Sequence, residues 1–548
     1  MATITGSEVL AQALRSQGVD TMFYLMGGPM LETEAACIKL GIRSIDHRHE
    51  QAASFAAHAY TRVMQRPGVC MGCSGPGATN LLTGVATAFT DCAPLVAIGG
   101  ASPRVYFGME AFQEIDQLAV FKPVTKWAER VYDAKRIPDV VATAFRQATS
   151  GRPGPVYIDM PGDILGEKIE EESVKYGAAW KPSPRTLGDT GAVKEAIALL
   201  ARAERPLVIA GSGVWWSDGA AALQAFVEAT GIPFYTKPIS RGLIPEDHAL
   251  SFLNARSTAF TEADVVVAVG TRFDWMIQFG RPPRFGADLK VIHVDVNPAE
   301  LGHNREVDVP IAGDARAVLQ QLTDEARGKV DPRRFTTWTG RLRVVDAEKG
   351  AESDKAMSTD TLPIHPLRLC KEVRDFLRRD AILVVDGQEI LNFGRQAIPT
   401  HVPGHRLNSG AFGTMGVGLP YGVGAKVAKP DAQVLVLHGD GSFGMNAMDI
   451  DTAVRHKINV VCVISNNGGW TADAPWTRPL PKPGRNLGHT RYDRMAIDLG
   501  AHGEFVEKPT EIRPALERAF ASGKPAVVNV ITDHKARAST VRFSAYTT

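Results

Sequence analysis

The chain has 548 residues, of which 44% are apolar and 22% are charged. This length exceeds the ~250–300 residues at which a single hydrophobic core stops growing, so we expect about three domains. The 61 basic and 60 acidic residues leave a net charge of +1, which argues against nucleic acid or an anionic membrane as the main partner.

Short runs rich in valine, isoleucine and leucine alternate with amphipathic, helix-length segments along the whole chain. This alternation predicts parallel sheets covered by helices on both faces. No apolar run approaches the roughly 18 residues of a membrane span. The N-terminus lacks a signal-peptide pattern, and six scattered cysteines form no disulfide framework, so a cytoplasmic protein is expected. The expected strands, in chain order, are Thr21–Leu25, Gly68–Cys73, Leu95–Gly99, Val156–Asp159, Leu207–Ala210, Val265–Val269, Val291–Asp295, Ile382–Asp386, Gln433–Leu437, Asn459–Ile464 and Ala526–Ile531.

Two polar, turn-rich stretches interrupt the alternation and are expected to be linkers. They are Glu171–Gly191 and Lys349–His365. The prediction is therefore an α/β protein with three doubly wound parallel-sheet domains. The expected boundaries are residues 1–175, 190–350 and 365–532, followed by a C-terminal tail, 533–548.

The most specific motif lies in the last third, where two successive strands each end in a polar, glycine-rich loop. Asp440 follows the first strand and Asn467 the second, with a helix expected over Phe443–His456 between them. In a strand–helix–strand unit, both loops lie at the carboxyl edge of the sheet, where ligands bind. Each loop alone would be an ordinary turn, but the pair predicts a shared site.

Hard oxygen ligands of this kind suit Mg²⁺ bridged to phosphates. We expect Asp440, Asn467 and the Gly469 carbonyl to be the metal ligands. The neighbouring Gly439, Gly441 and Ser442 would let the backbone approach the phosphates at a helix N-terminus.

Gly-Asp-Gly followed by Asn-Asn after one helix resembles the signature of thiamine diphosphate enzymes. The resemblance implies a pyrimidine-binding domain, a middle domain and a diphosphate-binding domain. It also implies Mg²⁺, and active sites formed between domains of different subunits, so that a homodimer or homotetramer is expected.

The resemblance further implies a catalytic glutamate near the N-terminus, and Glu50 in Asp46-His47-Arg48-His49-Glu50 fits. In this family the glutamate hydrogen-bonds N1′ of the aminopyrimidine, which leads to loss of the C2 proton of the thiazolium. A buried carboxyl suits that proton sharing. Taken alone, Glu50 would be a helix-start carboxylate favoured by the helix dipole. Ser74–Asn80, at a later strand end, supports the catalytic interpretation.

Other cofactor contacts follow from the same resemblance. Met415, among the glycines of Gly410–Gly418, fits the bulky residue that holds the cofactor bent, although methionine is also a common core filler. The remaining expected cofactor-binding residues are Pro29, Gly387, Gln388, Glu389, Gly413, Trp470 and Thr471.

Several segments resemble the branch of 2-hydroxyacyl-CoA lyases and oxalyl-CoA decarboxylases. They are Ala111–Leu118, Lys122–Trp127, Ser150–Pro155, Gly488–Asp493 and Lys535–Arg542. This branch implies an acyl-CoA substrate, and a basic tail could fold over its phosphates. The expected CoA contacts are Arg406, Lys535, Arg537 and Arg542; a frayed terminus is the alternative for the tail. Members of the decarboxylase group bind ADP in the middle domain, for which Arg152 and Asp295 are candidates.

The expected reaction is reversible cleavage of a short 2-hydroxyacyl-CoA to formyl-CoA and an aldehyde or ketone. Gln113 would hydrogen-bond the substrate oxygen, and Asp493 is the candidate for proton transfer at the 2-hydroxyl. Acetolactate synthase remains a rival because Phe112-Gln113-Glu114 also resembles it. An oxalyl-CoA decarboxylase is a second alternative, although those enzymes usually carry Tyr-Glu in place of Phe112-Gln113. A non-catalytic scaffold is the alternative of another class.

Overall fold

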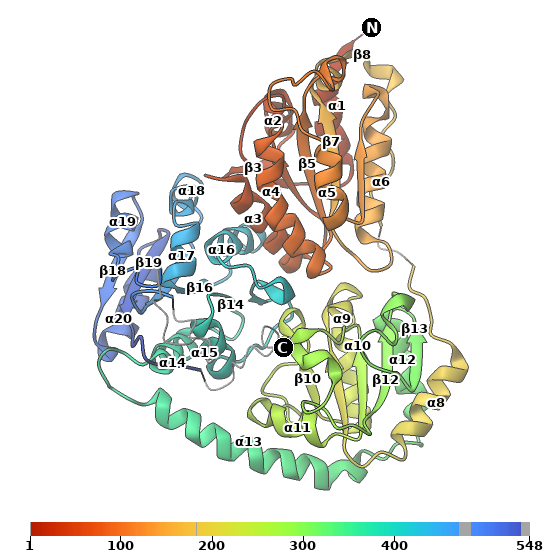
Figure 1. Ribbon diagram of the computed structural model, residues 1–548, viewed down its shortest axis with the longest axis vertical. Coiled ribbons are helices and arrows are strands. Elements are labelled where there is room, and N and C mark those ends of the chain that lie inside the picture. The colour runs from red at the N-terminus through yellow and green to blue at the C-terminus, as the bar shows by residue number, and fades with distance from the viewer. Residues whose placement is uncertain (1, 182–183, 471–483, 539–548) are drawn as a thin grey trace.

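The computed structural model describes residues 2–181, 184–470 and 484–538, and these form three α/β domains (Figure 1). Each domain has a parallel sheet with helices on both faces. The N-terminal domain is drawn in red and orange, the middle domain in yellow and green, and the C-terminal domain in cyan and blue. The three doubly wound domains predicted from the sequence are therefore confirmed.

The N-terminal domain contains a six-stranded parallel sheet in the order β3-β2-β4-β5-β7-β6. Its strands are β2 (Thr21–Tyr24), β3 (Arg43–Asp46), β4 (Gly68–Gly72), β5 (Leu95–Ala101), β6 (Trp127–Arg130) and β7 (Val156–Pro161), and a separate antiparallel pair is β1 (Thr3–Thr5) with β8 (Lys168–Glu170). Its α-helices are α1 (Gly6–Ser16), α2 (Leu31–Lys39), α3 (Glu50–Met64), α4 (Pro76–Thr90), α5 (Gln117–Phe121), α6 (Ile137–Thr149) and α7 (Gly162–Gly166). The central strands β4, β5 and β7 are buried along their whole length, as strands covered on both faces must be.

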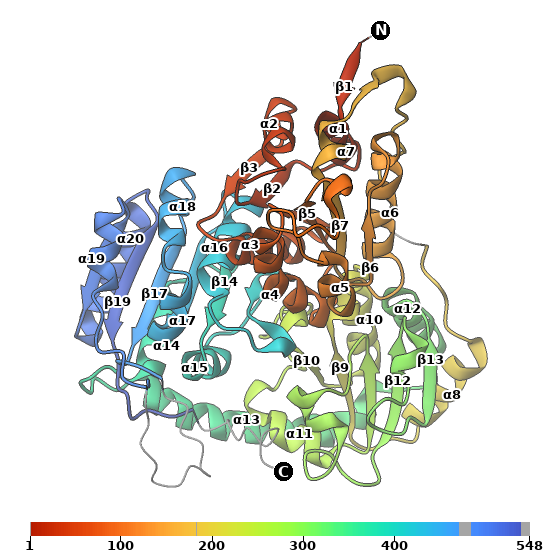
Figure 2. The same ribbon diagram turned by 45° about the horizontal axis from the view of Figure 1, so that its top comes forward.

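The middle domain has a five-stranded parallel sheet in the order β10-β9-β11-β12-β13. Its strands are β9 (Pro206–Ala210), β10 (Phe234–Thr236), β11 (Val265–Val269), β12 (Lys290–Asp295) and β13 (Val309–Ala312). Its α-helices are α8 (Thr190–Leu200), α9 (Ser212–Trp216), α10 (Ala220–Thr230), α11 (Arg256–Glu262), α12 (Ala315–Ala326) and α13 (Thr336–Met357). Figure 2 shows α13 crossing beneath the molecule from the middle domain towards the C-terminal domain.

The C-terminal domain has a six-stranded parallel sheet in the order β15-β14-β16-β17-β19-β18. Its strands are β14 (Ile382–Asp386), β15 (Arg406–Leu407), β16 (Val434–Gly439), β17 (Val461–Asn466), β18 (His502–Val506) and β19 (Ala526–Ile531). Its α-helices are α14 (Pro366–Phe376), α15 (Glu389–Ala397), α16 (Gly418–Ala428), α17 (Asp440–Met445), α18 (Asp449–Arg455), α19 (Tyr492–Asp498) and α20 (Pro509–Ala521).

The N-terminal and C-terminal domains share one hydrophobic core although they are far apart in the sequence. Helix α3 packs on α16, and the rings of Phe55 and Tyr421 meet edge to face at a centroid distance of 6.1 Å. Gly424 makes this close packing possible, because a Cβ there would lie 2.1 Å from the Ala56 carbonyl oxygen. The start of α3 is thereby held in a fixed position against the C-terminal domain.

Two sequence predictions about local structure were wrong. Helix α13 extends to Met357, so the expected linker Lys349–His365 is helical over its first half; its residues are mostly good helix formers, and no proline interrupts them. The expected helix Phe443–His456 is instead two short helices, α17 and α18, and α17 already begins at Asp440. Among the described residues, no helix combines the length and apolar character needed to cross a membrane.

Candidate active site

Three loops at the carboxyl ends of β14, β16 and β17 line one cavity in the C-terminal domain. These strands are neighbours in the sheet, so their ends lie side by side. The lining includes most of the residues that the sequence assigns to a cofactor site, namely Gly387, Gln388, Glu389, Met415, Gly439, Asp440, Gly441, Ser442, Asn467, Gly469 and Trp470. Residues from four separate stretches of the sequence thus meet at one sheet edge.

Three oxygen atoms converge at one end of this cavity. The side-chain oxygen of Asn467 lies 2.8 Å from the Gly469 carbonyl oxygen and 3.1 Å from Oδ1 of Asp440. Oδ2 of Asp440 is buried without a hydrogen-bond partner. With the Asn467 amide rotated, its NH2 group donates to both oxygens, so the observation that points to a cation is the buried Oδ2 of Asp440. The set is the hard-oxygen kind that Mg²⁺ prefers.

The electrostatic setting of Asp440 also suits a cation. Burial raises its pKa to about 6, against the lowering effect of nearby backbone N–H groups. A bound divalent cation would reverse this by favouring the ionised carboxylate. The residues therefore fit a metal ion, and metal binding by Asp440, Asn467 and Gly469 stays a prediction that this geometry supports.

The backbone around the expected metal ligands comes close to the indole ring of Trp470. A Cβ on Gly441 would lie 2.7 Å from the indole of Trp470, so only glycine fits there. Gly387 has φ of +124°, a conformation that side chains rarely adopt. Hydroxyl and amide groups lining such a cavity can approach phosphates closely.

Two of the expected cofactor residues lie elsewhere. Gly413, with φ of +72°, ends a single 3₁₀ turn outside the lining of this cavity. Pro29 is in the N-terminal domain, packed so closely against β5 that a Cβ on Gly100 would lie 2.5 Å from its ring. Thr471 lies outside the described residues.

A second group of candidate residues gathers in the N-terminal domain around the start of α3. Glu50 is 5% exposed, and Nδ2 of Asn80 donates a hydrogen bond of 3.0 Å to its Oε2. Gln113 has φ of +60°, and its Oε1 accepts a hydrogen bond of 2.8 Å from the Ser74 hydroxyl. The role of Asn80 as the partner of Glu50 was missed from the sequence, where it was noted only as part of a strand-end motif.

Neither Glu50 nor Gln113 lines the cavity of its own chain. The segment that carries Gln113 is also unusually exposed for its apolar content, with Val105 at 70%, Met109 at 68% and Phe112 at 85%. An exposed apolar segment of this size marks an interaction site. These two groups of candidate residues, on different domains and without a shared cavity among the described residues of one chain, are called the two half-sites below.

Asp493, the expected proton-transfer residue, lies at the start of α19 in an ion pair. The Arg491 guanidinium donates to both of its carboxylate oxygens, at 2.9 and 2.6 Å, and Asn529 donates a third bond of 3.2 Å. Burial acts to raise the pKa of Asp493, but these donors outweigh it and the pKa is lowered. Asp493 does not line the cavity, so this geometry does not support a proton-donating role.

The prediction that Arg406 contacts coenzyme A was wrong, because this side chain is buried. It forms the edge strand β15, where its side chain turns inward and is only 2% exposed. Burial and the nearby Arg241 lower its pKa well below the usual value. A group this enclosed cannot reach the phosphates of a ligand at the surface.

The beginning of the tail lies against the cofactor cavity. Asp533 and Ala536 contribute to its lining, and the Ala538 amide donates a hydrogen bond of 3.0 Å to the Glu389 carboxylate. The expected CoA contacts Lys535 and Arg537 lie in this stretch, and both are exposed. Arg542 lies outside the described residues.

The middle domain contributes a second cavity, of about 390 Å³, at the carboxyl edge of its sheet. Arg152 and Asp295, the candidates for a nucleotide, both line it, as do Ser212 and Gly213 of the glycine turn after β9. Arg152 forms an ion pair of 2.7 Å with Glu300, and burial raises the pKa of Asp295 to about 6. The volume is within the range of small-molecule sites.

Comparison with known proteins agrees with this arrangement. Three family models match: the N-terminal TPP binding domain of thiamine pyrophosphate enzymes over residues 4–120, the central domain over 193–322 and the C-terminal TPP binding domain over 391–530.

Similar proteins cover nearly the whole chain. The acetolactate synthase large subunit of Mycobacterium tuberculosis is 38% identical over 97% of this chain and 96% of its own length. Human 2-hydroxyacyl-CoA lyase 1 is 34% identical over 97% and 95%, and Escherichia coli oxalyl-CoA decarboxylase is 34% identical over 96% and 95%. The chain belongs to the thiamine pyrophosphate (thiamine diphosphate) enzyme family.

Proposed function

We propose that this protein is a thiamine diphosphate-dependent lyase that cleaves a short 2-hydroxyacyl-CoA to formyl-CoA and an aldehyde or ketone, reversibly. Membership of the family leaves the substrate open, because similar proteins include a synthase, lyases and a decarboxylase. The choice of an acyl-CoA rests on a group of arginines between the middle and C-terminal domains.

The arginine group consists of Arg256, Arg284 and Arg395. The guanidinium carbons of Arg256 and Arg284 lie 5.2 and 4.9 Å from the centre of the Phe260 ring. Arg241, behind them, is neutralised by a buried ion pair with Glu246. Burial, followed by the charges of Arg395 and Arg284, lowers the pKa of Arg256 to about 9. Burial, then Arg241 and Arg284, likewise lowers the pKa of Arg395. Such a concentration of positive charge favours a polyanion.

The arginine group is also placed where a long substrate would need it. Helix α15 begins at Glu389, which lines the cofactor cavity, and carries Arg395 near its other end. At 1.5 Å per residue, the two positions are separated by roughly 9 Å along the helix axis. Pyruvate is too small to reach both ends, whereas the phosphates of coenzyme A lie at the far end of a long arm.

In this proposal the two half-sites have different roles: one binds the metal and the diphosphate, and the other activates the cofactor. Bound thiamine diphosphate would supply a nucleophilic carbon and an electron sink. Asp440, Asn467 and Gly469 would hold Mg²⁺ against the diphosphate. Glu50 of the other subunit, oriented by Asn80, would share a proton with N1′ of the aminopyrimidine.

The remaining assignments follow from the same model. Gln113 would donate its amide hydrogen to the substrate oxygen, since its Oε1 is already bonded to Ser74. Lys535, Arg537 and Arg542 would close over coenzyme A. The middle-domain cavity, with Arg152 and Asp295, would hold ADP. Because the half-sites lie on different domains, the active form would be at least a dimer.

A substrate panel tests the proposal. The purified protein, with thiamine diphosphate and Mg²⁺, is incubated with 2-hydroxyacyl-CoAs, oxalyl-CoA or pyruvate, and the products are identified by mass spectrometry. We expect formyl-CoA from a 2-hydroxyacyl-CoA. Acetolactate from pyruvate, without thioester cleavage, would overturn the assignment, and CO₂ from oxalyl-CoA alone would favour a decarboxylase.

Two variants connect the assay to the arginine group. Arg256→Ala and Arg284→Ala should raise KM for the thioester on the order of tenfold or more, because each removes a charge-assisted contact. Arg333→Ala, which removes an exposed arginine of the middle domain, is the matched control and should change nothing.

Acetolactate synthase is the second candidate, because a relative with that name has the higher identity, 38% against 34% for human 2-hydroxyacyl-CoA lyase 1. The two candidates differ in what the arginine group would do. A synthase acting on pyruvate should be indifferent to Arg256→Ala, whereas the lyase should not.

A further inference from the structure

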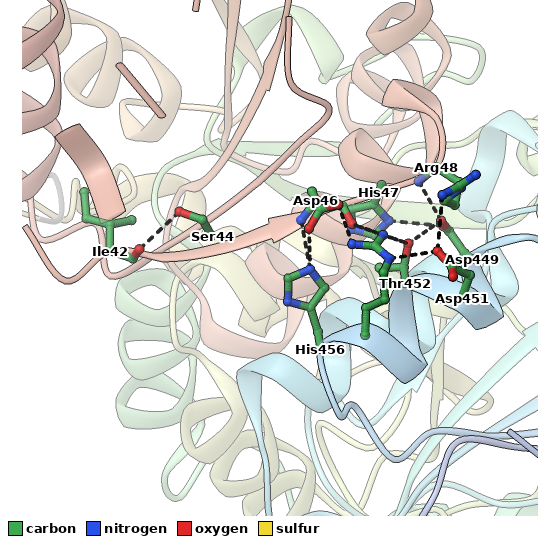
Figure 3. A network of polar contacts seen from close by, with 10 residues as sticks. Ile42, Ser44, Asp46, His47, Arg48, Asp449, Asp451, Thr452 and His456 are labelled. Carbon is green, nitrogen blue, oxygen red and sulfur yellow. Dashed lines mark hydrogen bonds and ion pairs between the residues drawn. The ribbon is translucent and has the colours of Figure 1, made fainter. Parts of the chain in front are cut away.

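The loop that leads into Glu50 is held by the C-terminal domain of the same chain. Strand β3 ends at Asp46 and α3 begins at Glu50, so the loop consists of His47, Arg48 and His49. Figure 3 shows the side chains of His47 and Arg48 beside Asp449 and Asp451 of α18. This contact lies outside both half-sites described above.

Asp449 makes the central contacts. Its Oδ2 lies 3.1 Å from Nδ1 of His47, and its Oδ1 accepts a hydrogen bond of 3.2 Å from the Arg48 amide (Figure 3). His47 is 0% exposed and Asp449 is 2% exposed. The hydroxyl of Thr452 donates a further bond of 3.2 Å to Asp449 and fixes its orientation.

Arg455 of α18 and His456, the residue that caps this helix, hold the strand end that precedes the loop. Nε2 of His456 lies 2.6 Å from Oδ1 of Asp46, and Nη2 of Arg455 donates to the Asp46 carbonyl oxygen at 3.1 Å. Burial acts to raise the pKa of Asp46, but His456 and Arg455 outweigh it and the pKa is lowered. Asp46, His47 and Arg48 are thus all restrained by one short helix.

We propose that Asp449 is a positioning residue for Glu50: by fixing His47 and the Arg48 backbone, it sets where α3 begins and hence where the Glu50 carboxyl lies. Rotation of the loop would displace the first turn of α3, which carries Glu50. This inference rests on the proposed role of Glu50 in cofactor activation. Because α18 follows α17, which begins at Asp440, the same helix also connects the chain's two half-sites.

The test uses the full-length protein and two readouts besides turnover. The first is backbone hydrogen–deuterium exchange of the peptide around residues 46–52 in the protein alone. The second is deuterium exchange at C2 of bound thiamine diphosphate, which reports proton removal at the cofactor. The dissociation constant of thiamine diphosphate, with Mg²⁺ present, is measured alongside.

In Asp449→Asn we expect the 46–52 peptide to lose protection and C2 exchange to slow about 10- to 100-fold, because small displacements of a catalytic group have effects of that size. The dissociation constant should not change, because the residue does not line the cofactor cavity. Asp264→Asn is the matched control: like Asp449, Asp264 anchors backbone amides, in its case those of Glu204 and Arg205, but it lies in the middle domain.

His47→Gln removes the imidazole while leaving Asp449 its bond to the Arg48 amide, and it keeps the proposal testable if Asp449→Asn does not fold. Unchanged C2 exchange in either folded variant would overturn the proposal. So would a parallel loss of cofactor affinity, which would indicate support of the metal loop instead. Glu50→Gln distinguishes a failure of the role proposed for Glu50 from a failure of the positioning role proposed for Asp449. If Glu50→Gln leaves C2 exchange intact, the role of Glu50 fails, and the positioning role fails with it.

Discussion

At the scale of single residues, Glu50 combines two properties that a proton-sharing carboxyl needs. It is almost fully buried, and Asn80 holds one of its oxygens while leaving the other for a ligand. Asn80 thereby fixes the direction in which the carboxyl points.

Glu50→Gln should reduce turnover by on the order of 10²–10⁴-fold, the usual contribution of a positioned acid or base. Cofactor binding should persist, because the metal and diphosphate contacts lie on the C-terminal domain. Steady-state kinetics and calorimetric titration with thiamine diphosphate measure the two effects separately. A non-catalytic scaffold would show no turnover, and the wild type and Glu50→Gln would then behave alike in both measurements.

Glu34 on α2 offers a prediction about stability. It is 4% exposed and its Oε1 has no hydrogen-bond partner; burial, followed by the charge of Asp46, raises its pKa to about 7. The folded protein therefore binds this proton more tightly than the unfolded chain does. Its contribution to stability is complete below pH 4.5, the ordinary pKa, and is lost as the pH rises through 7.

Glu34→Gln, which mimics the protonated acid, should thus be more stable than the wild type at pH 8, by on the order of 2–3 kcal/mol. At pH 5 the two proteins should differ little. Urea unfolding at both pH values checks this. If the free energy of unfolding of the wild type and of Glu34→Gln changes equally between pH 5 and pH 8, Glu34 is not the source of the pH dependence.

At the scale of elements, the tail closes one end of the cofactor cavity through Asp533, Ala536 and the bond from Ala538 to Glu389. Deletion of residues 535–548 removes this cover and the basic side chains proposed for coenzyme A. We expect KM for the thioester to rise on the order of tenfold while thiamine diphosphate still binds, since its expected ligands remain. Equal KM values for the deleted and complete proteins would exclude a lid.

The sequence was sufficient for elements whose pattern is local. Buried parallel strands such as β11 and β16 are continuous apolar runs, and two polar loops at the ends of successive strands together predict a site. Edge strands such as β15, two residues long, have no such pattern. The burial of Arg406 depends on packing between domains, which no local pattern contains.

Contacts between domains, which no local sequence pattern contains, also account for the site residues that the sequence did not predict. Asp440, Asn467 and Gly469 could be grouped from the sequence because strand topology brings their loops together, and the structure places all three at one cavity. Asp449 was not, because its partners lie some 400 positions earlier in the chain. The arginine group likewise depends on the way in which two domains meet.

At the scale of the whole molecule, the two half-sites predict complementation between inactive proteins. Glu50→Gln and Asp440→Asn each damage a different half-site. If every active site combines Glu50 of one subunit with Asp440 of the other, mixed dimers contain one intact site.

Co-expression of the two variants should therefore restore roughly a quarter of the wild-type activity, since about half of the dimers are mixed. Differential tagging isolates the mixed dimer for assay. Activity that stays at the level of the single variants would mean that each chain builds its site alone.

The network around Asp449 also limits how such proteins can be recombined. Its hydrogen bonds join residues 401 and 402 positions apart, so the N-terminal and C-terminal domains must match each other side chain by side chain. A chimera that takes the first domain from one relative and the last from another would fold each sheet correctly yet misplace the acid. Exchange of the middle domain alone would leave this junction intact.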